Sequence, residues 1–162
     1  MSIQKLAEKE LQLNSIVISL KGTIEEKEAQ IFELKLPEEF KKLHFEYAEL
    51  SNENVEAIKR GLFLYWFSLS EPMFLTGICE IDQVANRKII TNIEKIIDAD
   101  KIDYELSWML SYYKEWDWIF DNYKSDEKFY NALLSSNVSL PKINKGQMLD
   151  RGLMGKYWNS LN

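Results

Sequence analysis

The chain of 162 residues has one cysteine, one histidine, three prolines and six glycines. The single thiol, Cys79, cannot form a disulfide within the chain, which is typical of a reducing compartment. Any histidine-containing zinc site, and any Ser-His or Cys-His nucleophile, would have to use His44. Since His44 lies between Leu43 and Phe45 in a periodic apolar segment, we interpret it as a core-edge residue. We therefore predict no metal ligand set and name no catalytic residue.

Phosphate-binding and calcium-binding motifs are also missing. Neither G-x-x-x-x-G-K nor G-x-G-x-x-G occurs, so no loop that cradles phosphate is predicted. The acidic cluster from Asp98 to Glu105 has the spacing of a calcium loop only in part. The central glycine of that loop would fall at Asp103 and its bidentate glutamate at Met109. We interpret the cluster as a solvated turn between two helices and predict no cofactor.

Signals for membranes and nucleic acids are weak. The longest apolar run, residues 55–78, is interrupted by Glu71 and Pro72, whereas a membrane span needs about 20 apolar residues. The first twelve residues lack the apolar block of a signal peptide, so the expected location is cytoplasmic. The formal charge of −6 disfavours binding to nucleic acids and to anionic membranes. The +3 charge of residues 141–162 is too small to reverse that expectation.

The scarcity of glycine and proline and a hydrophobic content of 46% favour a globular protein built from long helices. Eight of ten heptad positions are apolar between residues 3 and 34, with spacings of three and four. We therefore predict one helix from about Ser2 to Lys35, which would pair with a second helix starting at Pro37 as an antiparallel hairpin spanning residues 1–50. Residues 15–20 and 32–36 also fit short strands, an alternative that would replace this helix.

The middle of the chain, residues 52–136, is predicted to hold the core helices. The run from 55 to 78 is apolar on every side, which indicates a helix at the centre of the core, with a break at Pro72. Further helices are expected at about 83–98, 103–123 and 125–136, with side-chain caps from the residues Asp82, Asp103 and Ser125. The tail, 137–162, is basic and irregular but apolar enough to dock on the body, with a short helix near 145–151. The prediction is a single all-α domain, a bundle of five to seven helices.

The segment from Asp103 to Glu127 is both acidic and aromatic, with seven acids and two bases. Tryptophan and tyrosine next to carboxylates supply contact area and orient a basic partner. At about 100° per residue these side chains cannot all face inward. We predict a partner-binding surface from Tyr112, Trp116, Asp117, Trp118 and Asp121. The alternative is that the basic tail, with Arg151, Lys156, Tyr157 and Trp158, covers it within the molecule.

A second candidate site lies at the helix break. A buried carboxylate must be paired or have a raised pKa, and Glu71 falls in the most apolar stretch of the chain. Arg60 lies about three helical turns earlier on roughly the same face, and Tyr65 lies between them. The alternatives are a polar pocket of Arg60, Tyr65 and Glu71 for a small ligand, a structural ion pair, or side chains that reach solvent.

These features favour a non-enzymatic protein that binds another protein. Small acidic chains without catalytic motifs include inhibitors that neutralise a basic enzyme or toxin, such as bacterial immunity proteins, and this is an analogy of composition. Self-association into a homodimer through the N-terminal seam, the row of apolar heptad positions between residues 3 and 34, is a further form of the same hypothesis. The alternative is a small-ligand-binding protein or an enzyme that uses carboxylate acid-base chemistry near Glu71.

Overall fold

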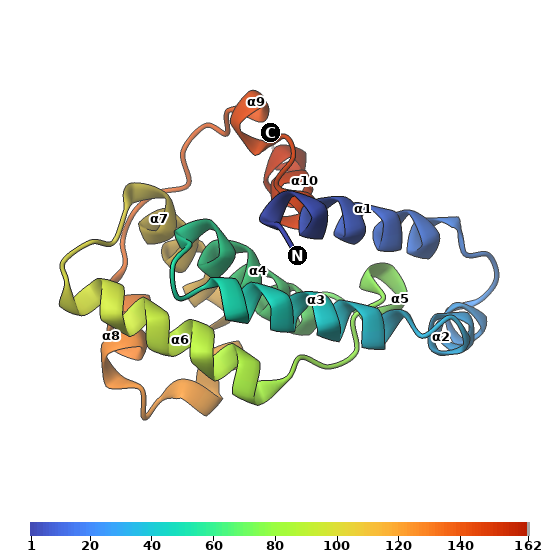
Figure 1. The fold of residues 1–162 in the computed structure, drawn as a ribbon, viewed down its shortest axis with the longest axis horizontal. Helices are drawn as coiled ribbons and strands as arrows, with labels where there is room; N and C mark the ends of the chain where they lie inside the picture. The colour runs from blue at the N-terminus through green and yellow to red at the C-terminus, as the bar shows by residue number, and fades with distance from the viewer. Residues whose placement is uncertain (162) are drawn as a thin grey trace.

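The computed structural model describes residues 1–161 and confirms a single all-α domain, with no strand in that range (Figure 1). Its helices exceed the five to seven predicted, because kinks and caps divide several of the expected long segments. The α-helices and one 3₁₀-helix (η1) of the described residues are α1 (Ile3–Ser19), α2 (Ile24–Glu33), α3 (Leu36–Leu50), α4 (Val55–Ser70), α5 (Met73–Thr76), α6 (Gln83–Asp98), α7 (Tyr104–Tyr113), η1 (Lys114–Tyr123), α8 (Glu127–Ser135), α9 (Lys145–Met148) and α10 (Gly152–Ser160).

The prediction of one helix from Ser2 to Lys35 is wrong, because the chain turns after α1. Gly22 has a φ of 115°, in the left-handed region that glycine adopts without steric cost. Thr23 then starts α2 with a capping box: its side chain accepts from the Glu26 N–H, and the Glu26 carboxylate accepts from the Thr23 N–H. A strong local start signal therefore overrides a continuous heptad pattern. The strand alternative for these residues is wrong as well.

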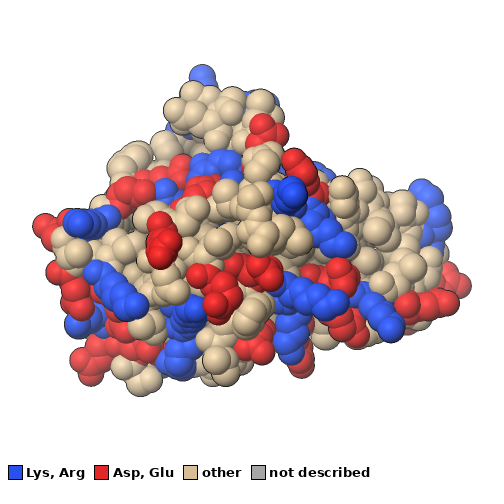
Figure 2. Space-filling model, viewed as in Figure 1, with Lys and Arg blue, Asp and Glu red and all other residues tan. Residues whose placement is uncertain are grey.

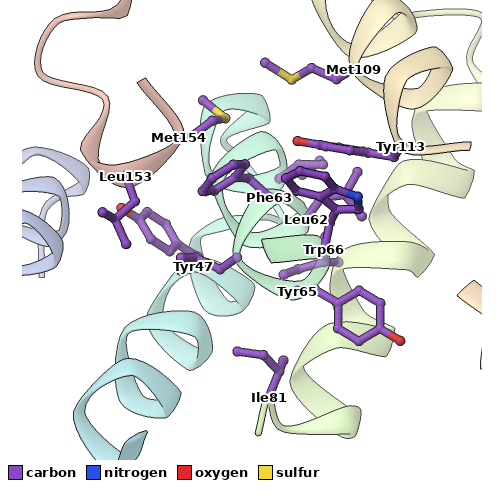
Figure 3. Close-up of a cluster of buried hydrophobic side chains, with 14 of the residues drawn as sticks. Tyr47, Leu62, Phe63, Tyr65, Trp66, Ile81, Met109, Tyr113, Leu153 and Met154 are labelled. Atoms are coloured by element: carbon purple, nitrogen blue, oxygen red, sulfur yellow. The ribbon is translucent and has the colours of Figure 1, made fainter. Parts of the chain in front are cut away.

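The centre of the core is α4, as the apolar run predicts. Ten consecutive residues from Ala57 to Trp66 are buried, so this helix has no solvent face over nearly three turns. The helices α3, α6 and α10 pack around it, together with η1. Figure 3 shows side chains of α4 such as Phe63 and Trp66 among residues of α3, α7 and α10.

The predicted break at Pro72 and several predicted caps are present. Glu71 has extended backbone geometry and ends α4, and Gly77, at a φ of 76°, ends the short helix α5. Side chains cap the following helices, because Asn54, Asp82 and Asp103 each accept from an N–H in the first turn of α4, α6 and α7 respectively. Local sequence thus decides where these helices begin.

The helix expected from Asp103 to Tyr123 is α-helical only as far as Tyr113. The chain continues as η1, where Trp116 (φ −119°, ψ 49°) and Phe120 (φ −101°, ψ 15°) have non-helical backbone angles. Three residues of η1, Ile119, Phe120 and Tyr123, are nevertheless buried. Their spacing of i, i+1 and i+4 places these three side chains on one side of the segment, which faces the core.

The C-terminal residues form two short helices in place of the single one expected near 145–151. Gly152, at a φ of 63°, separates α9 from α10. The last helix packs on α1 and α4 and buries Trp158 completely, with its ring centroid 4.9 Å from that of Trp108. Figure 1 shows α10 beside α1 and α9 next to α10, reached by a long irregular segment after α8.

Candidate functional site

The most exposed part of the predicted binding surface lies on η1. Trp118 is 55% exposed, and Glu115, Asp117 and Asp121 around it are exposed as well. The neighbours Ile119 and Phe120 are almost fully buried, so the backbone under the indole is held by the core. We call the four exposed residues the Trp118 surface. It combines a large aromatic contact area with three carboxylates on a segment that the core anchors.

The structure separates the five residues predicted for partner binding. Asp117, Trp118 and Asp121 belong to the Trp118 surface, but Tyr112 and Trp116 are half-buried. The Tyr112 hydroxyl lies 2.5 Å from the Tyr157 hydroxyl of α10, and the Trp116 ring centroid lies 5.3 Å from that of Trp66. The C-terminal helix therefore covers one part of the predicted surface, the alternative that the sequence left open, and leaves Trp118 outside.

Acidic and basic side chains are interspersed over the face of the molecule in Figure 2, and the charge around η1 is likewise more mixed than the sequence suggests. Asp121 pairs with Lys124 at 3.1 Å, and the Lys114 ammonium donates to the Ser136 carbonyl. Several acids counted with this segment pair with distant cations: Asp103 and Glu105 with Lys59, and Asp126 with Arg87. The acidic excess is therefore partly structural, and Glu115 and Asp117 remain as exposed carboxylates next to the indole.

The second predicted site, Arg60, Tyr65 and Glu71, is not one cluster of interacting side chains. The Arg60 guanidinium is buried and donates to the Glu56 carboxylate and to the carbonyls of Ile3 and Asp150. The Tyr65 hydroxyl donates to the Ile119 carbonyl at 2.8 Å. A hollow of about 260 Å³ beside Tyr65 is lined by Tyr65, Ser68, Leu69, Cys79, Glu80, Ile81 and Gln83. Neither Arg60 nor Glu71 belongs to that lining.

A buried carboxylate is found instead on α1, at a position that sequence reasoning did not single out. Glu10 is 1% exposed, accepts from the Leu153 N–H at 2.8 Å, and accepts from the Tyr47 hydroxyl. Burial raises the pKa of Glu10 to about 7, and the hydrogen bonds from Tyr47 and Leu153 oppose that rise. The available signal was a single acid at a seam position flanked by Leu6 and Leu13.

Next to Glu10 a network of charged side chains links α4, α7 and the C-terminal segment. The Arg151 guanidinium donates to both oxygens of Glu56 at 2.7 and 2.5 Å, and to both oxygens of Glu105 at 2.9 and 2.5 Å. Lys59 lies 3.0 Å from Glu105. Although partial burial alone would raise it, the pKa of Glu105 is lowered to about 2 by hydrogen bonds from Arg151 and Lys59. The network ties α10 to the body of the protein.

The histidine and the carboxylates do not form a metal centre in the part of the chain that the structure describes. No group of three or more His, Cys, Asp or Glu side chains in residues 1–161 is arranged to hold an ion. His44 is fully buried, with Nε2 3.2 Å from the Asn86 side-chain oxygen. Burial lowers the pKa of His44 to about 4, so the imidazole is neutral at pH 7. Its place in the core makes it a structural residue.

Residues 1–161 contain no helix with the length and apolar character needed to cross a bilayer. Comparison of the chain with family models, curated proteins and solved structures gives no match. Function is therefore argued from the surfaces and side chains described above.

Proposed function

We propose that this protein is a non-enzymatic binding protein that docks a basic protein partner on the Trp118 surface. The observation that carries the proposal is one residue: Trp118 is 55% exposed on a segment whose adjacent residues Ile119 and Phe120 are anchored in the core. Tryptophan is among the residue types most enriched at binding hot spots. A rigid exposed indole contributes contact area with little loss of side-chain entropy on binding.

Charge supports the choice of partner. Glu115, Asp117 and Asp121 lie within three residues of Trp118 in the sequence and are exposed, and the whole chain carries a formal charge of −6. Carboxylates at the rim of an interface steer a basic partner and raise its association rate more than its affinity. An inhibitor of the immunity type, which neutralises a basic toxin or enzyme, is the finer form of this proposal.

Self-association through the N-terminal heptad seam is less well supported. The seam residues Leu6, Leu13, Val17 and Ile31 are all buried within one chain, against α3 and its neighbours. A homodimer through this seam could therefore bury only its exposed part, such as Ile24 and Leu34, each 50% exposed. The small-ligand alternative near Glu71 likewise lacks support, because Arg60, Tyr65 and Glu71 do not converge on one hollow.

Site-specific crosslinking tests the proposal. A photoreactive phenylalanine derivative replaces Trp118 in the source organism's cells, and a matched variant carries it at Tyr104, which is 64% exposed on α7. We expect an adduct with one basic protein at position 118 and none at 104. Purified partner should then bind W118A at least tenfold more weakly, a loss of about 1.4 kcal/mol.

Association kinetics test the proposed role of the carboxylates next to Trp118. The double substitution D117N/D121N should slow association at low salt and change dissociation little, since rim charges act mainly on the encounter rate. The proposal would be contradicted if the adduct formed equally at positions 118 and 104. It would also be contradicted by an acidic partner that binds W118A as tightly as the unmodified protein.

A further inference from the structure

The start of α10 packs on one buried carboxylate, that of Glu10. Glu10 on α1 accepts from the backbone N–H of Leu153 in the first turn of α10 and from the Tyr47 hydroxyl on α3. Gly152 is packed so closely on this carboxylate that a Cβ there would lie 2.6 Å from Glu10 Oε2. Closure of α10 therefore removes the Glu10 carboxyl from water.

Charged groups on every side of Glu10 contribute to its environment. Tyr47 faces it from α3, and Arg60 and Glu56 act on it from α4. From the C-terminal segment, Arg151 binds Glu56, and Lys156 donates to Asn14 one turn further along α1. Within residues 1–161 no cation bonds directly to the Glu10 carboxylate. Arg60 donates instead to Glu56 and to the carbonyls of Ile3 and Asp150.

The C-terminal segment is attached in a way that allows it to leave as a unit. The residues before α9, from 136 to 144, have no helix, and most are exposed. A connector with few buried contacts can open locally, at a free energy below that of global unfolding. The helix α10 has five buried residues, so its release has to break those contacts as well. The attachment of α10 is concentrated at Gly152–Leu153, at the Arg151 network, and at the rings of Tyr157 and Trp158.

We propose that α10 is a proton-sensitive clasp, closed most tightly when the Glu10 carboxyl is protonated and released more readily when that carboxyl is ionised. An ionised carboxylate at 1% exposure has lost its hydration without gaining a directly bonded cation. A protonated carboxyl has no such penalty. Opening returns the group to water, so opening and ionisation of Glu10 favour each other.

The expected size of the effect follows from linkage. Burial raises the pKa of Glu10 from 4.5 to about 7 in the closed form, and the exposed group returns toward its ordinary value. Opening therefore releases a proton below pH 7, and the opening equilibrium constant rises with pH through the window from 4.5 to 7. Between pH 6 and pH 8 the constant should increase about tenfold, reaching a plateau above pH 7.

Release of the clasp would uncover aromatic rings of the core. Tyr157 and Trp158 contact Phe63, Trp66 and Tyr112, with ring centroids between 5.0 and 6.5 Å apart. Of these rings, Phe63 and Trp66 are labelled in Figure 3, which places Leu153 and Met154 of α10 next to Tyr47 and Phe63. Opening of the clasp would therefore expose a second aromatic surface, formed by Phe63, Trp66 and Tyr112, and the open fraction would depend on pH.

Hydrogen exchange of the full chain tests the clasp. Opening constants of α10 amides, corrected for the pH dependence of intrinsic exchange, are compared with those of α4 amides at pH 6 and pH 8. We expect α10 to open more often than α4 and its constant to rise about tenfold over this range. Glu10→Gln should abolish the rise, whereas Glu8→Gln, an exposed control on the same helix, should retain it.

Two results would overturn the proposal. One is an α10 opening constant equal to that of α4 at both pH values, which means that α10 opens only when the protein unfolds. The other is a pH-dependent rise that persists in E10Q. Carbon NMR of the Glu10 side-chain carboxyl in the unmodified protein is decisive even if E10Q does not fold: a titration midpoint near 7 supports the clasp, and one below 5 excludes it.

Discussion

Arg151 and Glu105 meet as a two-point pair, with Nη1 2.9 Å from Oε2 and Nη2 2.5 Å from Oε1, although 46 residues separate them in the sequence. Paired N–H···O bonds between guanidinium and carboxylate combine charge with fixed geometry. The same guanidinium also binds Glu56, so one C-terminal side chain bridges α4 and α7. Several properties of the protein depend on this kind of long-range pairing.

Removal of Arg151 should destabilise the protein substantially. Arg151→Ala leaves Glu56 and Glu105 without their shared cation in a half-buried setting, and we expect a loss of about 2–3 kcal/mol of unfolding free energy. Urea denaturation measures it. The control is Lys128→Ala, because Lys128 pairs with Asp98 at a well-exposed site and its loss should leave stability nearly unchanged. Equal losses in the two variants would refute a structural role for the network.

The two buried titratable groups should have opposite effects on stability. His44 has a folded pKa of about 4 against 6.5 unfolded, so its contribution is lost as pH falls from 6.5 to 4. Glu10 has a folded pKa of about 7 against 4.5 unfolded, so its contribution grows as pH falls from 7 to 4.5. Each amounts to about 3 kcal/mol, and over most of this range they cancel.

Single variants separate these two effects. E10Q should lose stability as pH falls from 6.5 to 4, whereas H44Q should gain stability as pH falls from 7 to 4.5. The wild type should vary little between pH 5 and 6.5. Urea denaturation across this pH range provides the test, and parallel curves for the two variants would show that one assignment is wrong.

Glycine at position 152 should be required because the backbone there packs directly against the Glu10 carboxylate. Gly152→Ala adds a Cβ 2.6 Å from Glu10 Oε2 at a backbone φ of 63°, so we expect a loss of about 2 kcal/mol from strain and crowding. Gly146→Ala is the matched control, because its nearest neighbour would lie at an ordinary 3.4 Å from the new carbon. Thermal unfolding should show a lower Tm for the first variant and a nearly unchanged Tm for the second.

Truncation of two tryptophans to alanine should change the free energy of unfolding by very different amounts. Trp118→Ala removes an exposed side chain and should change stability by less than about 0.5 kcal/mol, as expected for a residue kept for binding. Trp66→Ala removes the fully buried ring that contacts Tyr113 and Trp116 and should cost about 3–5 kcal/mol. A large loss of stability in W118A would assign Trp118 to the fold instead.

Several structural features could be predicted because their causes are local. Asn54 and Asp82 cap helices through side-chain bonds to an N–H two or three residues ahead, and Pro72 prevents α4 from continuing. The break at Gly22 has an equally local cause, the capping box of Thr23 and Glu26, which overrides the heptad pattern. The kinks of η1 at Trp116 and Phe120 are different, because no proline or glycine in residues 114–123 marks them.

The candidate sites were predicted less completely. The exposure of Asp117, Trp118 and Asp121 agrees with the argument that not every aromatic or acidic residue of that segment can face inward. Tyr112 lies against Tyr157 of α10 and Trp116 against Trp66 of α4, and Arg60 and Glu71 do not share a hollow. Composition indicates which residue types are available for binding, but the packing of distant segments decides which of them remain exposed.

By itself the sequence determined the helical class, the apolar central helix and most helix starts, since these follow from periodicity and from hydrogen bonds between near neighbours. Only the tertiary structure decided that Glu10 accepts from the N–H of Leu153, 143 residues away. The physical reason is that the free energy of a buried charge depends on its surroundings in space. Those surroundings form only when α1, α3, α4 and α10 pack together.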